Sequence, residues 1–420
     1  MKIAVIGSGI SGLSTAMFLN EDHDVHLIEK DFRLGGHANT VNITIQDKPI
    51  SVDTGFIVYN EVNYPLFTKL LTHLNVVSQP TEMSFSVSEA KKGFEFRPTS
   101  LKTLFPSFKN LTNSSFLYML FEIPRFNESV KKAISEQITL GEFIQKYNFS
   151  SFLSKYYITP LSASIWSAST EDIMSMPLVT FVNFMTNHGL LSFRHQLQWR
   201  TIPGGSIKYV EAIASLLKNK PRTNADLLYI ERDEKEVRLY YKNSPEEKFD
   251  AVFIATHADT ALRLLKNPTE EETGALSKFK FSKNKAVLHS DSSLLPAHKA
   301  VKASWNFHIL TQSREKVTIT YLMNKLQPLE TKTDILISLG MDRHIREDLV
   351  IDSFDYEHPI IDHDALKGQA DIEALQGTKN TYYVGAWLGY GFHEDGIRSA
   401  GKATKEFLRR HFNHSNSFLD

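Results

Sequence analysis

Three glycines and one glutamate near the start of the chain have the types and spacing of a nucleotide-phosphate site. Gly7, Gly9 and Gly12 form a Gly-x-Gly-x-x-Gly turn, and Glu29 follows 22 positions after Gly7. Gly7 permits a tight turn, Gly9 lets a diphosphate approach bare main chain, and Gly12 lets the next helix pack closely. A carboxylate placed like that of Glu29 can accept hydrogen bonds from a ribose diol. These residues predict a site for a dinucleotide.

The segments around these residues are those that such a site needs. Residues 2–6 are an apolar run typical of a buried strand, and residues 13–19 show helical spacing of apolar side chains. Residues 25–28 form a second apolar run that ends at Glu29. In the unit of strand, turn, helix, strand and acid, the helix N-terminus offers free N–H groups and a positive dipole end to phosphates. The order therefore indicates a complete dinucleotide-binding unit.

Segments much later in the chain are expected to belong to this unit as well. The run 251–256 reads as a buried strand, and 381–386 reads as another that leads through a glycine-rich turn into a last helix over 397–412. The stretch from 64 to 187 reads as mostly helical, with a hairpin over 83–96. The chain is therefore expected to alternate between two domains.

Composition excludes several classes of function. The chain has 420 residues, 42% of them hydrophobic and 23% charged, which is typical of an ordinary globular protein. It has no cysteine, so disulfides, thiolate metal sites and a cysteine nucleophile are excluded. A formal net charge of −1 argues against nucleic acid as a partner, because no basic excess is present to neutralise phosphates. The segment 358–364 fits no standard zinc spacing, so no metal is predicted.

Apolar segments bear on location and substrate. The run at 2–6 is too short for a signal peptide, and no uninterrupted apolar window reaches about 18 residues, so we expect no spanning helix and a cytoplasmic protein. The segment 101–126 is rich in Phe and Leu. One interpretation is helix core. The other is an apolar tunnel or a membrane-dipping surface, which would place the protein peripherally on the inner membrane. The sequence leaves the oligomeric state open.

Together these motifs resemble a known superfamily. The glycine turn, Glu29, Arg33-x-Gly35-Gly36 and the later Asp53-x-Gly55 follow the order of the flavin-containing amine oxidases, a group that includes protoporphyrinogen oxidase and phytoene desaturases. Segments 187–191, 198–201, 303–306 and 389–396 are similar to a bacterial subfamily of predicted NAD/FAD-binding proteins, often encoded near cyclopropane-fatty-acid synthase-like enzymes. The Arg-x-Gly-Gly segment favours FAD over NAD, because this glycine pair lies against FAD in the superfamily.

The resemblance implies the fold and its division. We expect an α/β protein with a Rossmann-type FAD-binding domain and an interleaved α+β substrate domain, as in amine oxidases. The FAD-binding domain would comprise 1–65, 200–270 and 375–415. The substrate domain would comprise 66–199 and 271–374.

The resemblance also implies which residues hold FAD. Leu227 would supply backbone groups to adenine and Ala255 would close a strand beside the adenosine, with ordinary strand packing as the alternative for both. The last helix would aim N–H groups at the isoalloxazine ring near Gly396. Two departures are His37 in place of the usual Arg, and Ala386 in place of the acid that often follows the glycine of the last strand. The predicted cofactor residues are Gly7, Gly9, Ser11, Gly12, Glu29, Lys30, Gly36, His37, Thr40, Leu227, Ala255, Gly385, Gly396 and Ile397.

No acid or base stands out for catalysis. His393 lies beside the flavin turn and could move a proton or be a satisfied structural histidine. Lys285 and His289 lie on a strand where amine oxidases place a flavin-facing lysine. The candidates for the substrate wall, each with core packing as the alternative, are Trp166, Phe193, Trp199, Trp305, Tyr390 and Phe392.

These expectations lead to one function and three alternatives. The chain would be an FAD-dependent oxidoreductase that abstracts hydride from a C–H bond of an apolar, small-molecule substrate of fatty-acyl class. The alternatives are a redox-neutral double-bond isomerase, an amine oxidase, and a non-catalytic FAD-stabilised binding protein.

Overall fold

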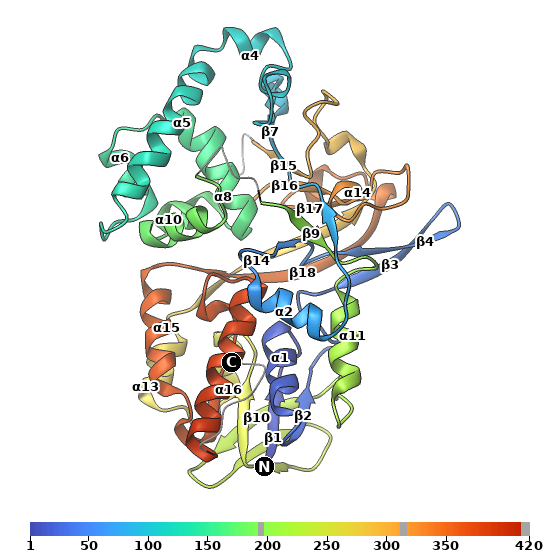
Figure 1. Ribbon diagram of the computed structural model, residues 1–420, viewed down its shortest axis with the longest axis vertical. Coiled ribbons are helices and arrows are strands. Elements are labelled where there is room, and N and C mark those ends of the chain that lie inside the picture. The colour runs from blue at the N-terminus through green and yellow to red at the C-terminus, as the bar shows by residue number, and fades with distance from the viewer. Residues whose placement is uncertain (192–196, 311–316, 413–420) are drawn as a thin grey trace.

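The computed structural model describes residues 1–191, 197–310 and 317–412. They form two units, which lie one above the other in Figure 1. The lower unit contains both the N-terminus and the last helix. The upper unit contains a cluster of helices beside a second sheet. The long strands β14 (Lys280–His289) and β18 (Val350–Ile360) run between the two units.

The lower unit is built on a four-stranded parallel sheet in the order β19-β13-β1-β2. Alternate residues of β1 pack on opposite sides: Ile3 lies in the cluster formed with α1 and α16, whereas Ala4 lies in the cluster on the other face. This burial on both faces is why the strands read as continuous apolar runs. The bounds are β1 (Lys2–Ile6), β2 (Asp24–Ile28), β13 (Ala251–Ile254), β19 (Thr381–Tyr383), α1 (Ile10–Leu19) and α16 (His393–His411).

Shorter strands and helices complete the lower unit and connect it to the upper unit. The antiparallel sheet β10-β11-β12 covers the second face of the parallel sheet, and β3 pairs with β4 as a ribbon. Their bounds and those of their neighbours are β10 (Leu227–Arg232), β11 (Val237–Tyr241), β12 (Glu247–Phe249), β3 (Thr40–Ile45), β4 (Lys48–Asp53), β5 (Tyr59–Asn60), β6 (Gln79–Thr81), β9 (Trp199–Thr201), α2 (Pro65–His73), α11 (Ile207–Leu216), α12 (Ala258–Leu264), α13 (Glu270–Leu276) and α15 (His363–Leu375).

The upper unit combines a seven-stranded sheet, in the order β18-β14-β17-β16-β15-β7-β8, with a group of helices. The expected hairpin over 83–96 is present as β7 and β8. A π-helical turn at Ser154–Ile158 leads into α8, and such turns are frequent at functional sites. The remaining bounds are β7 (Phe85–Glu89), β8 (Phe94–Phe96), β15 (Trp305–His308), β16 (Ile319–Leu322), β17 (Leu336–Leu339), α3 (Leu101–Leu104), α4 (Phe108–Thr112), α5 (Ser114–Lys132), α6 (Leu140–Lys146), α7 (Ser151–Leu153), α8 (Thr159–Trp166), α9 (Thr170–Ser175), α10 (Leu178–Asn187) and α14 (Met323–Leu326).

Helices α2 and α15, and also the end of α13 at Leu276, pack on the other side of the expected domain boundaries. Phe67 of α2 lies in the core cluster of α1 and α16, and Ile372 of α15 lies in the cluster on the second face of the parallel sheet. The carboxylate of Glu394 in α16 accepts hydrogen bonds from the N–H groups of Leu66 and Phe67, which supplies the N-terminal cap that the sequence of α2 lacks. We therefore propose that the FAD-binding domain includes α2 and α15, and the other boundaries stay a prediction.

No helix in residues 1–191, 197–310 or 317–412 has both the length and the apolar character needed to cross a bilayer.

Candidate active site

The glycine turn after β1 forms an open cradle. Gly7 has a φ of +100°, and α1 begins at Ile10 with Gly9 as its N-cap and no side-chain cap. A Cβ atom built on Gly9 would have no heavy atom within 4 Å, so the space above it is free. Uncapped N–H groups beside free space at a helix N-terminus are an anion site. The cradle therefore fits a diphosphate.

Glu29 and the second glycine pair are held against this turn. One carboxylate oxygen of Glu29 accepts from the N–H of Ser8 (2.8 Å) and the hydroxyl of Ser8 (2.6 Å), and the other accepts from the N–H of Asp31 (2.9 Å). The N–H of Gly35 donates to the Ser8 hydroxyl (3.2 Å). A Cβ on Gly36 would lie 3.0 Å from the Cα of Gly9. The motifs at 7–12, 29 and 35–36 thus form one continuous surface.

This surface is one end of a cavity of about 1860 Å³ that continues between the two units. Pockets for one small ligand occupy roughly 300–1,000 Å³, so this cavity has room for a cofactor and a substrate together. The structure brings most of the predicted cofactor residues to its lining, and their contacts with FAD stay a prediction. Those that line it are Gly7, Gly9, Ser11, Glu29, Lys30, Gly36, His37, Leu227, Ala255 and Gly385.

Gly12, Gly396 and Ile397 do not line the cavity, and their predicted cofactor roles stay a prediction. A Cβ on Gly12 would lie 1.9 Å from the carbonyl oxygen of Gly7, and one on Gly396 would lie 2.7 Å from Cγ2 of Ile10. Both glycines therefore permit close packing of α1. The side chain of Ile397 is buried in the core of the lower unit.

The start of the last helix differs from the expectation in the same region. We expected the helix over 397–412, but α16 begins at His393. The N–H of Gly396 already donates to the carbonyl oxygen of Phe392 (3.1 Å), so it is not available to a ligand. The N–H groups of the first turn instead belong to residues 393–395, and His393 and Phe392 line the cavity.

Thr40 belongs to a buried junction outside the cavity lining, and its predicted cofactor role stays a prediction. Its hydroxyl donates to Asp53 (2.6 Å) and accepts from the N–H of Ile207 (3.0 Å). Asp53 also accepts hydrogen bonds from the N–H and hydroxyl of Ser206 and from the side-chain amide of Gln327. Burial raises the pKa of Asp53 to about 6, against the opposing effect of these donors. The junction joins β3, β4, α11 and the upper unit.

None of the three catalytic candidates presents a group that titrates near pH 7 to the cavity. The ring of His393 stacks on Phe56 with 3.5 Å between centroids, and its Nε2 forms a 2.8 Å hydrogen bond with the hydroxyl of Tyr209. Burial lowers the pKa of His393 to about 3, so it is neutral near pH 7. His289 is buried away from the cavity and pairs with Ser338, and Lys285 is exposed outside the lining. The geometry supports a structural role for His393 and no catalytic role for the other two.

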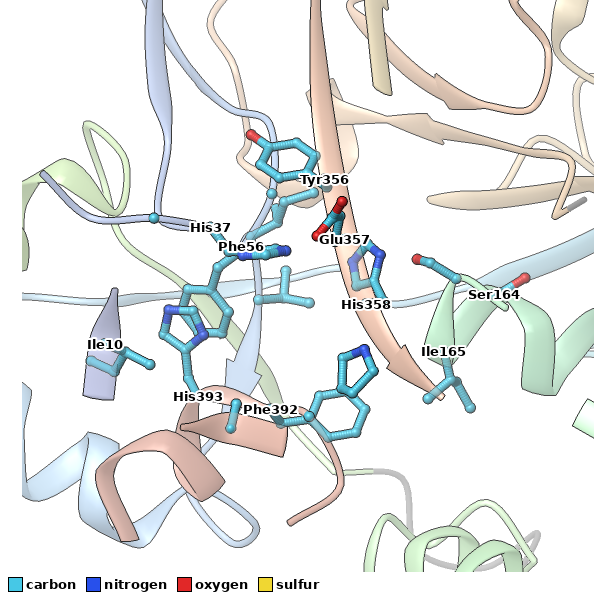
Figure 2. A pocket seen from close by; sticks show the side chains of 18 of the residues that line it. Ile10, His37, Phe56, Ser164, Ile165, Tyr356, Glu357, His358, Phe392 and His393 are labelled. Carbon is cyan, nitrogen blue, oxygen red and sulfur yellow. The ribbon is translucent and has the colours of Figure 1, made fainter. Parts of the chain in front are cut away.

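A histidine cluster that no sequence motif indicated also lines the cavity. The rings of His37 and His358 lie 5.3 Å apart between centroids, and His37 also lies 6.3 Å from His257. Nδ1 of His257 lies 3.3 Å from a carboxylate oxygen of Glu357. Figure 2 shows Glu357 and His358 adjacent on the strand that crosses the cavity, with His37 on one side. The only available signal was the segment 358–364, which we considered solely for metal binding.

The histidines of this cluster are uncharged near neutral pH. Burial lowers the pKa of His358 to about 4, with His257 adding to the effect, and it lowers the pKa of His37 well below its usual value. The side-chain amide of Asn284 donates to Nδ1 of His358 (3.0 Å), which leaves the ring proton on Nε2. His358 therefore presents a neutral N–H group.

The end of the cavity in the upper unit is mostly apolar, and the two charged side chains Glu82 and Arg97 that also line the cavity form an ion pair with each other. Trp199, Trp305 and Phe392 line it as predicted wall residues, whereas Trp166 packs on Phe184 in the core and Tyr390 lies outside the lining. The prediction for Phe193 lies outside the described residues. The apolar lining includes Leu104, Leu120, Ile123, Leu161, Ile165, Phe184, Leu190, Ile337 and Leu339.

The described parts of the chain contain no group of three or more His, Asp or Glu residues arranged to hold a metal ion.

Comparisons with known proteins place this geometry in a family. The family described as flavin containing amine oxidoreductase matches residues 10–352. L-amino acid oxidase from Bothrops pictus is 24% identical over 290 residues, which cover 64% of this chain and 55% of that protein. L-amino-acid oxidase BmooLAAO-I from Bothrops moojeni is 24% identical over 291 residues, covering 64% of this chain and 54% of its own. The chain thus spans about half the length of these relatives.

Solved structures share the fold over nearly the whole chain. The CLA-producing fatty acid isomerase from P. acnes superposes with a TM-score of 0.70 at 13% identity, covering 98% of each chain. Cyclohexylamine oxidase from Brevibacterium oxydans IH-35A superposes with a TM-score of 0.71 at 15% identity, covering 97% of this chain and 99% of its own. At these identities the likeness shows the fold alone.

These findings confirm the α/β fold of the amine oxidase type, the superfamily, the class of FAD-dependent oxidoreductase and FAD as cofactor. The finer resemblance to a bacterial subfamily stays a prediction. The chain belongs to the flavin-containing amine oxidoreductase family.

Proposed function

We propose that this protein removes a hydride from a C–H bond of an apolar substrate of fatty-acyl class. One observation carries the proposal: the cavity that starts at the diphosphate cradle continues into an apolar end. Among the described lining residues between 104 and 190 and between 305 and 339, none is Asp, Glu, Lys or Arg. A hydrocarbon chain gains about 25 cal/mol per Å² buried there, whereas an ammonium group would lose its hydration without a charged partner.

The two ends of the cavity would bind different ligands, FAD at the cradle and the substrate at the apolar end. The cradle at Gly9 and the uncapped start of α1 would bind the diphosphate of FAD, and Glu29 is placed for the ribose. Bound FAD supplies the hydride acceptor. His393, the first residue of α16, lines the cavity, so the positive end of this helix dipole would lie near negative charge that develops there.

The polar side chains beside the apolar end stay uncharged or are engaged. His358 keeps its proton on Nε2 and is neutral because its pKa is about 4. The hydroxyl of Tyr356 is bound to Thr54 and to the side-chain amide of Asn39. A neutral lining avoids the desolvation cost of a buried charge next to an alkyl chain. The carboxylate of Glu357 also lines the cavity but is engaged with Nδ1 of His257, so the neutral side chains of this end suit an alkyl chain better than an ammonium group.

The experiment is an anaerobic reduction assay with purified flavin-loaded protein. Unsaturated and saturated fatty acids should bleach the flavin absorbance, and simple amines and L-amino acids should not. Bleaching by L-amino acids or amines alone would overturn the fatty-acyl proposal and favour the activity named for the Bothrops relatives. A lipid product with a shifted double bond and an oxidised flavin would indicate redox-neutral isomerisation. No change in lipid or flavin would indicate a binding protein.

A variant of Ile165 tests the location of the site. Ile165 lies on α8 and faces the cavity in Figure 2. Ile165→Trp should fill the apolar end and slow bleaching by long acyl chains by about tenfold or more, while flavin content stays unchanged, because overfilled sites reject a ligand sterically. Ile165→Val is the matched control and should stay within about threefold of the parent. Equal rates for the two variants would contradict the proposed site.

A further inference from the structure

The helices at the top of Figure 1 expose large apolar side chains. These residues come from α3, α4 and α5, at the end of the molecule opposite the N-terminus. We call them the tip patch. Its members, with their exposed fractions, are Leu101 (76%), Phe108 (77%), Leu111 (50%), Leu117 (43%), Tyr118 (53%) and Phe121 (75%).

Helix α5 is apolar on two faces. Its inner stripe is buried in the core of the upper unit and consists of Phe116, Met119, Ile123, Phe126 and Val130. The spacing of these residues is that of one helical face. A surface helix normally carries polar residues on its outer side, yet α5 carries Leu117, Tyr118 and Phe121 there. Core packing therefore explains the inner stripe and leaves the outer one without a role, and exposed clusters of this kind mark interaction sites.

The segment 91–121, which carries most of the tip patch, has more basic than acidic residues, and two of its basic residues, Lys92 and Arg97, are paired with Glu89 and Glu82. Between residues 91 and 121 the only acid is Glu95, whose carboxylate accepts from the N–H groups of Ala297 and His298. The whole chain, by contrast, has a net charge of −1. The basic residues of the segment are Lys91, Lys92, Arg97, Lys102 and Lys109.

Two of these lysines directly follow apolar members of the patch in sequence. Lys102 follows Leu101 on α3, and Lys109 follows Phe108 on α4. The ammonium group of Lys109 also lies 3.4 Å from the Cβ position of Gly93, next to Lys91 and Lys92. Aromatic and aliphatic side chains bordered by lysines suit the interface of a bilayer with anionic head groups, where the apolar groups enter the acyl boundary and the ammonium groups meet phosphates.

The tip patch is continuous with the cavity. Leu101 belongs to both, and its neighbours Ser100 and Leu104 on α3 and Leu120 on α5 also line the cavity. We propose that the tip patch docks the protein on the surface of an anionic lipid bilayer and that acyl substrates pass from the bilayer into the cavity beside α3. Docking stands on the patch and its charges alone, whereas passage of an acyl substrate rests on the proposed function.

The test is co-sedimentation of the flavin-loaded protein with lipid vesicles at low salt. Vesicles with about 30% phosphatidylglycerol should bind the protein, and pure phosphatidylcholine vesicles should bind it at least about fivefold less. Phe108→Asp with Phe121→Asp should reduce binding to the anionic vesicles by at least about tenfold. Lys102→Gln with Lys109→Gln should reduce it by roughly 25-fold at low salt and by less at high salt.

Matched controls separate docking from general damage. Val62 and Val77 are 69% and 77% exposed, and neither lines the cavity, so Val62→Asp with Val77→Asp should bind vesicles like the parent. Each variant should retain its flavin content and circular dichroism. Absence of vesicle binding by the parent, or equal loss in both Asp pairs, would overturn the proposal. A dimer in gel filtration that the Phe pair dissolves, without vesicle binding, would assign the patch to a second copy of this chain.

Flavin bleaching by soluble and by vesicle-borne acyl compounds tests membrane docking separately from the proposed function. Bleaching by a short, water-soluble acyl substrate should be unchanged in the Phe108→Asp with Phe121→Asp variant, while bleaching by vesicle-borne acyl chains should fall. Vesicle binding without bleaching by any acyl compound would overturn the proposed function and leave docking standing. If vesicle-borne acyl chains bleached the flavin of the parent and of this variant at the same rate, passage of the substrate through the tip patch would be overturned.

Discussion

The two ends of the cavity are built by different means. The cradle end consists of main chain and one carboxylate, and its parts at Gly7, Gly9, Glu29 and Gly36 lie within 36 residues of sequence. The apolar end consists of side chains from helices and strands that lie far apart in the chain, such as Leu104, Leu161 and Ile337. The histidine cluster joins His37 to His358 across more than three hundred residues.

This difference separates what must stay fixed from what can vary. A diphosphate is bound by N–H groups, so the cradle needs bare backbone in a particular turn and tolerates no added atom. An apolar chain is bound by area and shape, which many combinations of side chains supply. We therefore expect a substitution in the cradle to abolish FAD binding. Substitutions in the other regions should have graded effects.

The largest effect is expected from Gly9→Val. The Gly9 backbone is extended, with φ −64° and ψ 177°, and its Cβ position is free, so valine fits the protein and obstructs only the diphosphate. The purified variant should be folded by circular dichroism and colourless, with flavin absorbance lost.

Gly274→Val is the matched control. Gly274 on α13 has the same open Cβ position but does not line the cavity, so this variant should stay yellow. A yellow Gly9→Val protein with the parent's flavin content would remove the basis for placing the diphosphate in the cradle.

A smaller effect is expected at the junction between the two ends. Asp53→Ala leaves the buried N–H of Ser206 and the side-chain amide of Gln327 without their acceptor. The free energy of unfolding should fall by about 3 kcal/mol, measured by urea denaturation. Ser51→Ala on the same strand removes an exposed hydrogen bond to Asn42 and should cost no more than about 0.5 kcal/mol. If the two variants lost the same free energy of unfolding, the Asp53 junction would not hold the two ends of the cavity together.

The smallest effect concerns pH and a residue outside the cavity. Burial lowers the pKa of His289 from 6.5 to about 4, so between these values the unfolded chain binds the extra proton and the native protein does not. The free energy of unfolding should therefore be greatest above pH 6.5 and fall, on the order of 2 kcal/mol for this residue, as pH drops toward 4. His289→Gln should flatten that slope in a urea series, whereas the exposed His363→Gln should leave it unchanged. If the free energy of unfolding depended on pH in the same way in both variants, the assignment of this pH dependence to His289 would be contradicted.

Local sequence predicted the cradle better than the rest of the site. The turn, α1, β2 and Glu29 are as expected, because glycine spacing and apolar runs dictate backbone geometry over short distances. The start of α16 was misplaced because the turn before it is fixed by Asp395, whose carboxylate accepts from the N–H groups of Tyr390 and Phe392. The hydrogen bonds of Thr40 could not be predicted, because its partners Asp53 and Ser206 meet it only in the folded protein.

The segment 101–126 shows why two interpretations remained open in the sequence. Phe116 is in the core, Leu120 lines the cavity and Phe121 is exposed, and a membrane-dipping role for the segment stays a prediction. Apolar content is the same in all three cases. Only the rotation of α5 against the upper unit decides which side each residue faces.

By itself, the sequence determined the nucleotide-binding unit, since bare main chain, helix dipole and adjacent strand are specified by residues that follow one another. Tertiary structure alone decided the lining of the apolar end, the neutral histidines at 37 and 358 and the exposed tip. Burial and packing are properties of segments brought together by folding, and they set both the pKa of a side chain and the surface it meets.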